Sequence, residues 1–155
     1  MDVVILVGTM TGNAQLVAQE LELGFSDVDT RIVVMPMDDL DPGVFERDAV
    51  FLVCTSTYGR GEVPDNARDL FDALQAQRPD LSAVRYGILA LGDSSFVDTF
   101  AHGGMRFDQL LAALGARRIG ERAIVDAAGT ELPEDAAARW MRAWLDEARA
   151  AVVAA

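Results

Sequence analysis

Short apolar runs rich in β-branched residues alternate with helical patterns along the whole chain. Five such runs are mostly apolar on both faces, as buried parallel strands are: residues 3–7, 31–35, 49–54, 86–91 and 118–125. Four further segments carry apolar side chains at helical spacing: residues 13–23, 65–77, 104–114 and 133–152. Residues 38–46 are too short and too acidic a segment for more than a turn or brief helix. Strands that alternate with helices form a parallel sheet covered on both faces, so we predict an α/β fold with five parallel strands.

The size and the cysteine content limit the class of protein further. The chain has 155 residues, 51% of them hydrophobic, which suits one well-formed core and is too little for two ordinary domains. We therefore expect a single domain over residues 1–155. The single cysteine, Cys54, excludes an internal disulfide and is typical of a reducing compartment. The sequence shows neither a signal peptide nor a membrane-spanning run, so we expect a cytoplasmic protein.

The charge of the chain is strongly negative. It has 13 basic and 25 acidic residues, which give a formal net charge of −12. This charge argues against nucleic acid and anionic membranes as partners and favours a basic protein surface. Solubility alone explains any single carboxylate equally well.

A polar loop joins the first predicted strand to the first predicted helix. It consists of Thr9, Met10, Thr11, Gly12, Asn13 and Ala14. The first N–H groups of a helix lack intrahelical acceptors and carry the positive end of its dipole, so this position suits a phosphate. No lysine follows Gly12, which excludes the Walker loop and favours a small phosphate monoester. A polar loop that merely caps the helix is the alternative interpretation.

Two more unusual loops follow the third and fourth predicted strands, at residues 55–66 and 91–96. Ligands of parallel α/β sheets bind at the carboxyl ends of the strands, where all three loops are expected to lie. Tyr58 and Phe96 each stand among small or polar residues of these loops, where the core requires no large ring. Two such aromatic side chains can sandwich a flat heterocycle. The three loops together predict a ligand with a phosphate at one end and a planar ring at the other.

These motifs resemble those of the flavodoxin-like proteins. The similarity lies in residues 9–14, in Ser-Thr-Tyr-Gly-Arg-Gly-Glu-Val-Pro-Asp-Asn at 56–66, and in Ala-Leu-Gly-Asp-Ser-Ser-Phe at 90–96. The chain most resembles the MioC-type flavodoxins and the FMN domains of diflavin reductases such as cytochrome P450 reductase and the sulfite reductase flavoprotein. The resemblance covers nearly the whole chain. It implies a flavodoxin-like three-layer sandwich of the short-chain type, with strand order 2-1-3-4-5 and noncovalently bound FMN.

The resemblance also assigns the binding residues. The phosphate would be held by Thr9, Met10, Thr11, Gly12, Asn13 and Ala14. One face of the flavin ring would meet Ser56, Thr57, Tyr58 and Gly59. The other face would meet Leu91, Gly92, Asp93 and Phe96. Neither a catalytic residue nor a metal ion is expected.

The chain departs from the reductase pattern at three positions near the flavin. Phe96 stands where the reductases usually have tyrosine, which keeps the stacking surface and loses a hydroxyl. Arg60 places a cation where an acid is common, and it opposes the effect of Glu62 and Asp93 on the flavin potential. Asp126 is the one acid directly after the fifth predicted strand, where the reductases are more acidic.

The resemblance implies an electron carrier rather than an enzyme. The protein would take electrons from a separate NADPH-dependent flavodoxin or ferredoxin reductase and pass them to an acceptor redox enzyme, as a monomer with an acidic docking surface. A flavodoxin-fold NAD(P)H:quinone oxidoreductase is the alternative, and an interaction module without flavin is a third hypothesis. A phosphorylatable receiver domain is excluded because the third predicted strand ends Val53-Cys54-Thr55, without an acceptor aspartate.

Other conspicuous residues have simpler explanations. Cys54 is expected to be a buried small hydrophobic residue, and His102 a solvated loop residue. Trp140 and Trp144 lie one helical turn apart and are expected to pack on the sheet. Three acids at helical spacing form either a solvated face or a docking patch for basic partners: Asp65, Asp69 and Asp72.

Overall fold

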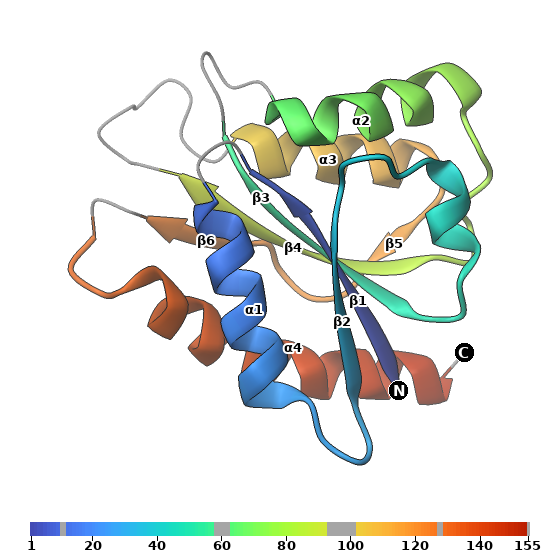
Figure 1. The fold of residues 1–155 in the computed structure, drawn as a ribbon. Coiled ribbons are helices and arrows are strands. Elements are labelled where there is room, and N and C mark those ends of the chain that lie inside the picture. Colours follow the sequence, from blue (N-terminus) through green and yellow to red (C-terminus); the bar gives the residue numbers. More distant parts are fainter. Residues whose placement is uncertain (10–11, 58–62, 93–101, 127–128, 155) are drawn as a thin grey trace.

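The computed structural model describes residues 1–9, 12–57, 63–92, 102–126 and 129–154. A parallel sheet of order β2-β1-β3-β4-β5 lies at its centre, and β6 pairs with β4 as well (Figure 1). The strands are β1 (Asp2–Gly8), β2 (Arg31–Pro36), β3 (Val50–Ser56), β4 (Arg85–Gly92), β5 (Arg117–Arg118) and β6 (Ala123–Asp126). The helices are α1 (Asn13–Phe25), α2 (Asp65–Gln77), α3 (His102–Ala113) and α4 (Pro133–Ala154), and a short 3-10 helix, η1, spans Pro42–Glu46. The predicted three-layer fold and strand order are confirmed.

The two faces of the sheet bury alternate residues of each strand. Helices α2 and α3 cover one face, and α1 and α4 cover the other (Figure 1). Val4 and Leu6 of β1 belong to the core beneath α2 and α3, whereas Val3 and Ile5 pack against α1 and α4. Burial on both faces explains why the strands are apolar throughout instead of alternating with polar residues.

The edge of the sheet differs from the prediction, because the expected fifth strand is divided into β5 and β6. Arg118 pairs with Tyr86 and Ala123 pairs with Leu89. Between these two pairs the edge segment has four residues, 119–122, whereas β4 has only two, 87–88. The extra length is taken up around Gly120, whose φ is +67°. A positive φ is accessible to glycine at little cost, which lets the strand leave the sheet and return.

Helix α3 is fixed to the sheet by a buried polar cluster. Asp108 is 5% exposed and accepts hydrogen bonds from the Tyr86 hydroxyl (2.6 Å) and from the Arg118 guanidinium. Burial, followed by the hydrogen bond to Asp108, raises the pKa of Tyr86 above its usual range. The cluster pairs the buried carboxylate with a cation and a hydroxyl donor, so α3 is held at a defined position along β4.

Helix α4 packs closely on β4 through the predicted tryptophan contact. Trp144 is 2% exposed, and its indole N–H donates to the Ile119 carbonyl at 3.1 Å. A Cβ atom on Gly87 would collide with the Trp144 ring, so this close contact requires glycine. Trp140 stacks on Trp144 with ring centroids 5.5 Å apart and remains partly exposed. In the described part of the chain, no helix is both long and apolar enough to cross a membrane.

Candidate ligand site at the carboxyl ends of the strands

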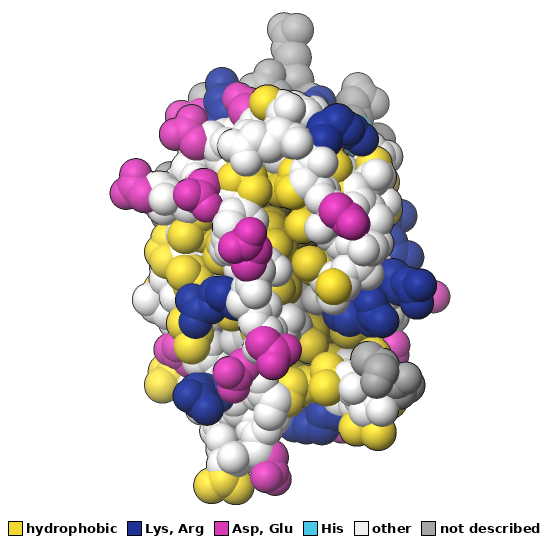
Figure 2. All heavy atoms as spheres, turned by 90° about the vertical axis from the view of Figure 1, so that its right-hand side faces the viewer, with side chains coloured by type: hydrophobic (Ala, Val, Ile, Leu, Met, Phe, Trp, Pro, Cys, Tyr) yellow, Lys and Arg dark blue, Asp and Glu magenta, His cyan; other side chains and the backbone are white. Residues whose placement is uncertain are grey.

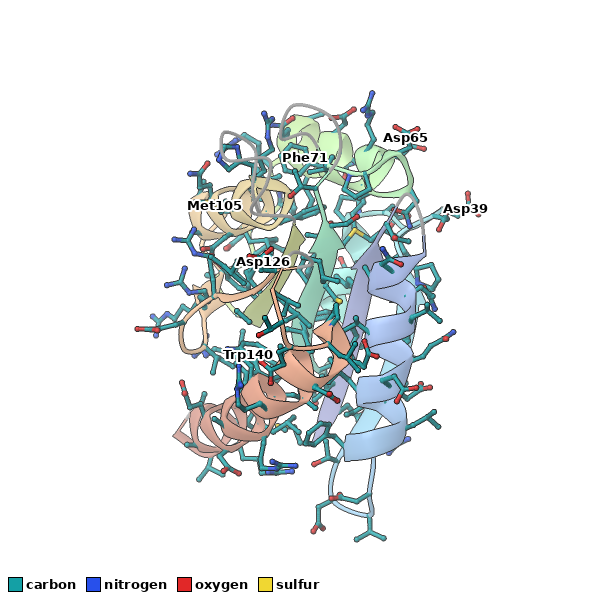
Figure 3. All side chains as sticks on the ribbon, turned by 90° about the vertical axis from the view of Figure 1, so that its left-hand side faces the viewer. Asp39, Asp65, Phe71, Met105, Asp126 and Trp140 are labelled. Atoms are coloured by element: carbon teal, nitrogen blue, oxygen red, sulfur yellow. The ribbon has the colours of Figure 1, made fainter. Side chains whose placement is uncertain are left out.

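The three predicted loops begin at neighbouring strand ends. The strands β1, β3 and β4 are adjacent in the sheet, and their carboxyl ends are level because Gly8 pairs with Thr55 and Ser56 pairs with Leu91. Figure 3 shows this side of the molecule, with Asp126 at the end of β6. The structure describes eight of the predicted site residues at this edge: Thr9, Gly12, Asn13, Ala14, Ser56, Thr57, Leu91 and Gly92. Other residues of the prediction lie outside the described residues: Met10, Thr11, Tyr58, Gly59, Arg60, Glu62, Asp93 and Phe96.

The amino terminus of α1 has the properties that the sequence predicts for a phosphate site. The first intrahelical bond runs from the Leu16 N–H to the Gly12 carbonyl (3.0 Å), so the N–H groups of residues 13–15 have no acceptor within the helix. Gly12, the N-cap, has φ of +89° and no side chain that could cap these groups. The first turn of α1 contains no acidic residue. The N–H donors can bind an anion such as a phosphate, and no carboxylate in this turn would repel it.

Thr9 closes the turn that leads into α1. Its Oγ1 accepts a hydrogen bond from the Gly12 N–H at 2.9 Å. Because the oxygen is the acceptor of this bond, the Thr9 hydroxyl proton stays available for a ligand. Asn13 is exposed at the start of the helix, where its amide can donate as well.

Two predicted contact residues can take part only through their backbone. Ala14 is fully buried, and its carbonyl accepts a weak hydrogen bond from the Cys54 thiol at 3.6 Å. Leu91 is 7% exposed, and its side chain packs in the core beneath α1 and α4. Their side chains therefore position the backbone at the site and do not line it.

The end of β3 is joined to the start of α3. The Gly103 N–H donates to Thr57 Oγ1 at 3.0 Å, and the Ser56 hydroxyl donates to the Gly8 carbonyl at 3.5 Å. A Cβ atom on Gly103 would collide with the Ser56 carbonyl oxygen, so glycine allows the helix to approach. The prediction overlooked Gly103, although a glycine pair at the start of an amphipathic helix is a sign of close backbone packing. Thr57 acts as an acceptor toward α3, which leaves its hydroxyl proton for a ligand.

Asn66 is a second residue whose function the motif alone did not reveal. It lies in the first turn of α2, and its side-chain oxygen accepts a hydrogen bond from the Thr9 N–H at 2.7 Å. The predicted phosphate loop and the loop after β3 are thereby linked.

Two described titratable residues near this edge, Cys54 and His102, are at least partly buried. Burial raises the pKa of the Cys54 thiol to about 12, as expected for a small core residue and not for a nucleophile. His102 was expected in a loop, but it is the first residue of α3 and is partly buried. Among the described residues, no three His, Cys, Asp or Glu side chains gather in a way that could hold a metal ion.

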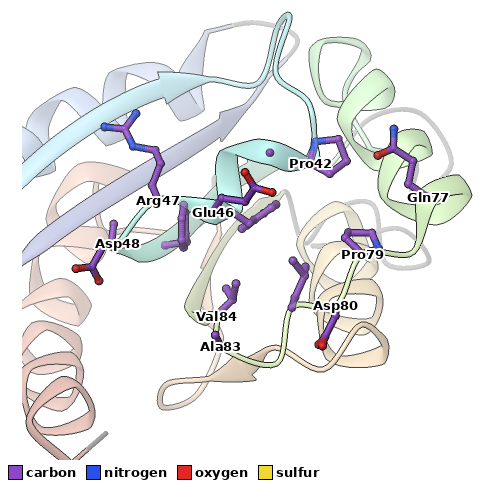
Figure 4. Close-up of a pocket in the computed structure, with 14 residues that line it drawn as sticks. Pro42, Glu46, Arg47, Asp48, Gln77, Pro79, Asp80, Ala83 and Val84 are labelled. Atoms are coloured by element: carbon purple, nitrogen blue, oxygen red, sulfur yellow. The ribbon is translucent and has the colours of Figure 1, made fainter.

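A separate pocket lies at the opposite end of the strands. The face in Figure 2 is hollowed, with hydrophobic side chains visible between charged ones. The pocket has a volume of about 570 Å³ and lies between η1, the end of α2 and the start of β4 (Figure 4). Val84, Pro79 and Pro42 contribute to its wall, and Asp80 lies at its rim. None of the eight described site residues lines it.

The chain matches the Flavodoxin family over residues 5–140. It is 41% identical to the protein named flavodoxin YqcA of Pectobacterium carotovorum subsp. carotovorum, over 92% of this chain and 93% of that protein. It is 33% identical to the protein MioC of Escherichia coli O157:H7, over 94% of this chain and 97% of that protein. The solved structure of a C101A mutant of flavodoxin from Pseudomonas aeruginosa superimposes with a TM-score of 0.84 at 35% identity, over 95% of this chain and 98% of that one.

The similarity to this solved structure extends over 95% of the chain and agrees with the observed order of strands and helices. The resemblance to flavodoxin-like proteins is therefore confirmed. The chain belongs to the flavodoxin family, whose members are FMN-binding electron carriers rather than enzymes.

Proposed function

We propose that this protein is a short-chain flavodoxin that binds FMN at the carboxyl ends of β1, β3 and β4. The observation that carries the proposal is the amino terminus of α1, where N–H groups without acceptors in the helix follow Gly12 after the end of β1, the strand next to β3. This arrangement suits a ligand with a phosphate at one end and a flat ring at the other. When bound, FMN would supply the reversible electron transfer of this function.

Different residues of the proposed site would bind the phosphate and the ring of FMN. The phosphate would accept hydrogen bonds from the Thr9 hydroxyl, the Asn13 amide and the first N–H groups of α1. The ring would lie between the loops after β3 and β4, with the Thr57 hydroxyl donating at its edge. Several residues outside the described ranges complete the proposed site, as the motifs imply: Met10, Thr11, Tyr58, Gly59, Asp93 and Phe96.

We propose further that the protein receives electrons from an NADPH-dependent flavodoxin or ferredoxin reductase and passes them to an acceptor redox enzyme. The net charge of −12 supports a basic docking surface on these partners. Asp65, Asp69 and Asp72 are all exposed on α2, beside the proposed site. Asp39 is also exposed and lies toward the same side as Asp65 in Figure 3. The guanidinium group of Arg68 lies 3.5 Å from Asp65 Oδ1, so the proposed docking patch on α2 also contains a basic residue.

We also propose that the chain is one monomeric domain that acts in the cytoplasm. The sheet has a continuous core on each face, which supports a single domain. The buried thiol of Cys54 is compatible with a reducing compartment.

The proposal is tested with visible spectra of the purified protein loaded with FMN under anaerobic conditions. NADPH is added first, and a flavodoxin or ferredoxin reductase is added second. We expect the flavin to keep its oxidised spectrum with NADPH alone and to bleach after the reductase is added. Direct bleaching by NADPH would support the quinone-reductase alternative, and failure to bind FMN would contradict both functions.

A further inference from the structure

The side chain of Asn66 joins three segments that are far apart in the sequence. Its Oδ1 accepts from the Thr9 N–H at 2.7 Å, and its Nδ2 donates to the Val7 carbonyl at 3.1 Å. The same Nδ2 donates to Asp38 Oδ2, also at 3.1 Å. One amide thus connects the end of β1, the first turn of α2 and the loop after β2.

The chemistry of the three partners fixes the orientation of this amide. Thr9 offers a donor, whereas Val7 and Asp38 offer acceptors. Only an amide with its oxygen toward Thr9 satisfies all three, because the reversed amide would place N–H against N–H and oxygen against oxygen. An aspartate has the same shape but cannot donate to the two acceptors when it is ionised.

Thr9 is therefore held from both sides. Asn66 binds its N–H, and the Gly12 N–H binds its Oγ1 at 2.9 Å. The second bond uses Oγ1 as an acceptor, so the hydroxyl proton must be donated elsewhere. A phosphate at the amino terminus of α1 is an acceptor of the required kind.

We propose that Asn66 is a positioning residue for phosphate recognition, which acts by holding the backbone of Thr9 and keeps the negative charge of Asp38 on the far side of a neutral amide. This inference rests on the proposed function as an FMN carrier. Asn66 binds the protein backbone through its side chain and has no direct contact with the flavin in this proposal. Its effect is therefore on the phosphate end of the ligand and not on the ring.

The test compares FMN with riboflavin, which has the same ring and lacks the phosphate. Kd values for both ligands are measured by quenching of flavin fluorescence on the full-length apoprotein, for the unaltered protein and for Asn66→Ala and Asn66→Asp. Gln75→Ala, an exposed polar residue on the same helix, is the matched control. Hydrogen exchange of the Thr9 amide in the apoprotein reports directly on the bond to Asn66.

We expect Asn66→Ala to weaken FMN binding about tenfold or more, as the loss of hydrogen bonds to a partly buried group does, and to change riboflavin binding less than about twofold. Thr9 amide exchange should speed up in this variant. Asn66→Asp, which keeps the shape and suits the first turn of a helix, should lose at least as much FMN affinity because it adds negative charge near the phosphate. Gln75→Ala should leave both affinities unchanged.

Equal FMN affinity in the unaltered protein and Asn66→Ala would overturn the inference. An equal loss for FMN and riboflavin would also overturn it, because that result indicates a general structural role. If Asn66→Ala does not fold, Asn66→Ser, which is also uncharged, decides by the same comparison of FMN with riboflavin. Absence of FMN binding by the unaltered protein would instead contradict the proposed function itself, so the two failures are distinguishable.

Discussion

Thr57 serves the fold and the proposed site with one hydroxyl group. Its Oγ1 accepts the Gly103 N–H at 3.0 Å, at the amino terminus of α3, where the backbone N–H groups lack intrahelical acceptors. The same hydroxyl can donate its proton to a ligand at the edge of the sheet. Because one hydroxyl has both tasks, we expect its removal to lower the stability of the fold and to weaken ligand binding together.

We predict that Thr57→Val lowers the free energy of unfolding of the apoprotein by about 1 kcal/mol, because the helix loses its capping acceptor. Thr57→Ser keeps the hydroxyl and should stay within about 0.5 kcal/mol of the unaltered protein. Urea unfolding of the three proteins provides the measurement. A Thr57→Val variant as stable as Thr57→Ser would show that the hydroxyl does not cap α3.

Cys54 predicts a dependence of stability on alkaline pH. Its pKa is about 12 in the folded chain, against an ordinary value of 9.0 that applies to the unfolded chain. Above about pH 9 the unfolded chain releases a proton that the folded chain retains, so stability falls as pH rises toward the folded pKa. The buried neutral thiol makes its full contribution to the free energy of unfolding below the pKa that the thiol has in the unfolded chain.

Between about pH 9 and pH 10, the loss attributable to Cys54 approaches about 1 kcal/mol, since the limiting slope is about 1.4 kcal/mol per pH unit. Urea unfolding of the apoprotein across this range measures the slope, and Cys54→Ala is the control that lacks the thiol. Parallel curves for the two proteins would contradict the deep burial of Cys54. Native protein should likewise resist thiol reagents that modify the unfolded chain.

At the scale of elements, the interrupted edge strand was the main error of the prediction. Ile119, Ala123 and Val125 suggested one continuous apolar strand, and the positive φ of Gly120 could not be recognised from the pattern. Helix α2, in contrast, spans the predicted residues from Asp65 to Gln77, because Pro64 marks its beginning and its apolar spacing is regular. Local sequence signals thus located the helices. The break between β5 and β6 depends instead on how these two edge strands pair with β4.

We predict that Gly120→Ala lowers the free energy of unfolding by about 1–2 kcal/mol, because an alanine at φ of +67° is strained. Its Cβ would also lie 2.6 Å from Glu147 Oε2, but that exposed side chain can move. The matched control is Gly24→Ala in α1, where a Cβ meets nothing within 4 Å. This control should be neutral or stabilising by up to about 1 kcal/mol. Equal effects of the two substitutions would contradict a special conformation at Gly120.

At the scale of the whole molecule, the strand order brings the candidate site together. The prediction located the strand ends at which the three loops begin because each loop follows an apolar run, and the order of β1, β3 and β4 makes these ends neighbours. It did not recover the bond between Thr9 and Asn66, whose partners are 57 positions apart. It also did not show that Leu91 and Ala14 are buried in β4 and α1, because it assigned both to polar loops whose residues are expected to be exposed. Such contacts follow from tertiary packing and leave no local sequence signal.

The most direct test of the account is an NMR titration of the ¹⁵N-labelled apoprotein with one equivalent of FMN. We predict the largest amide shifts at the carboxyl ends of β1, β3 and β4 and at the start of α1, including Thr9, Gly12, Asn13 and Thr57. Ala83 and Val84, in the pocket at the opposite end of the strands, should keep their positions. Shifts centred on that pocket, or no shifts at all, would contradict the assignment of the FMN site.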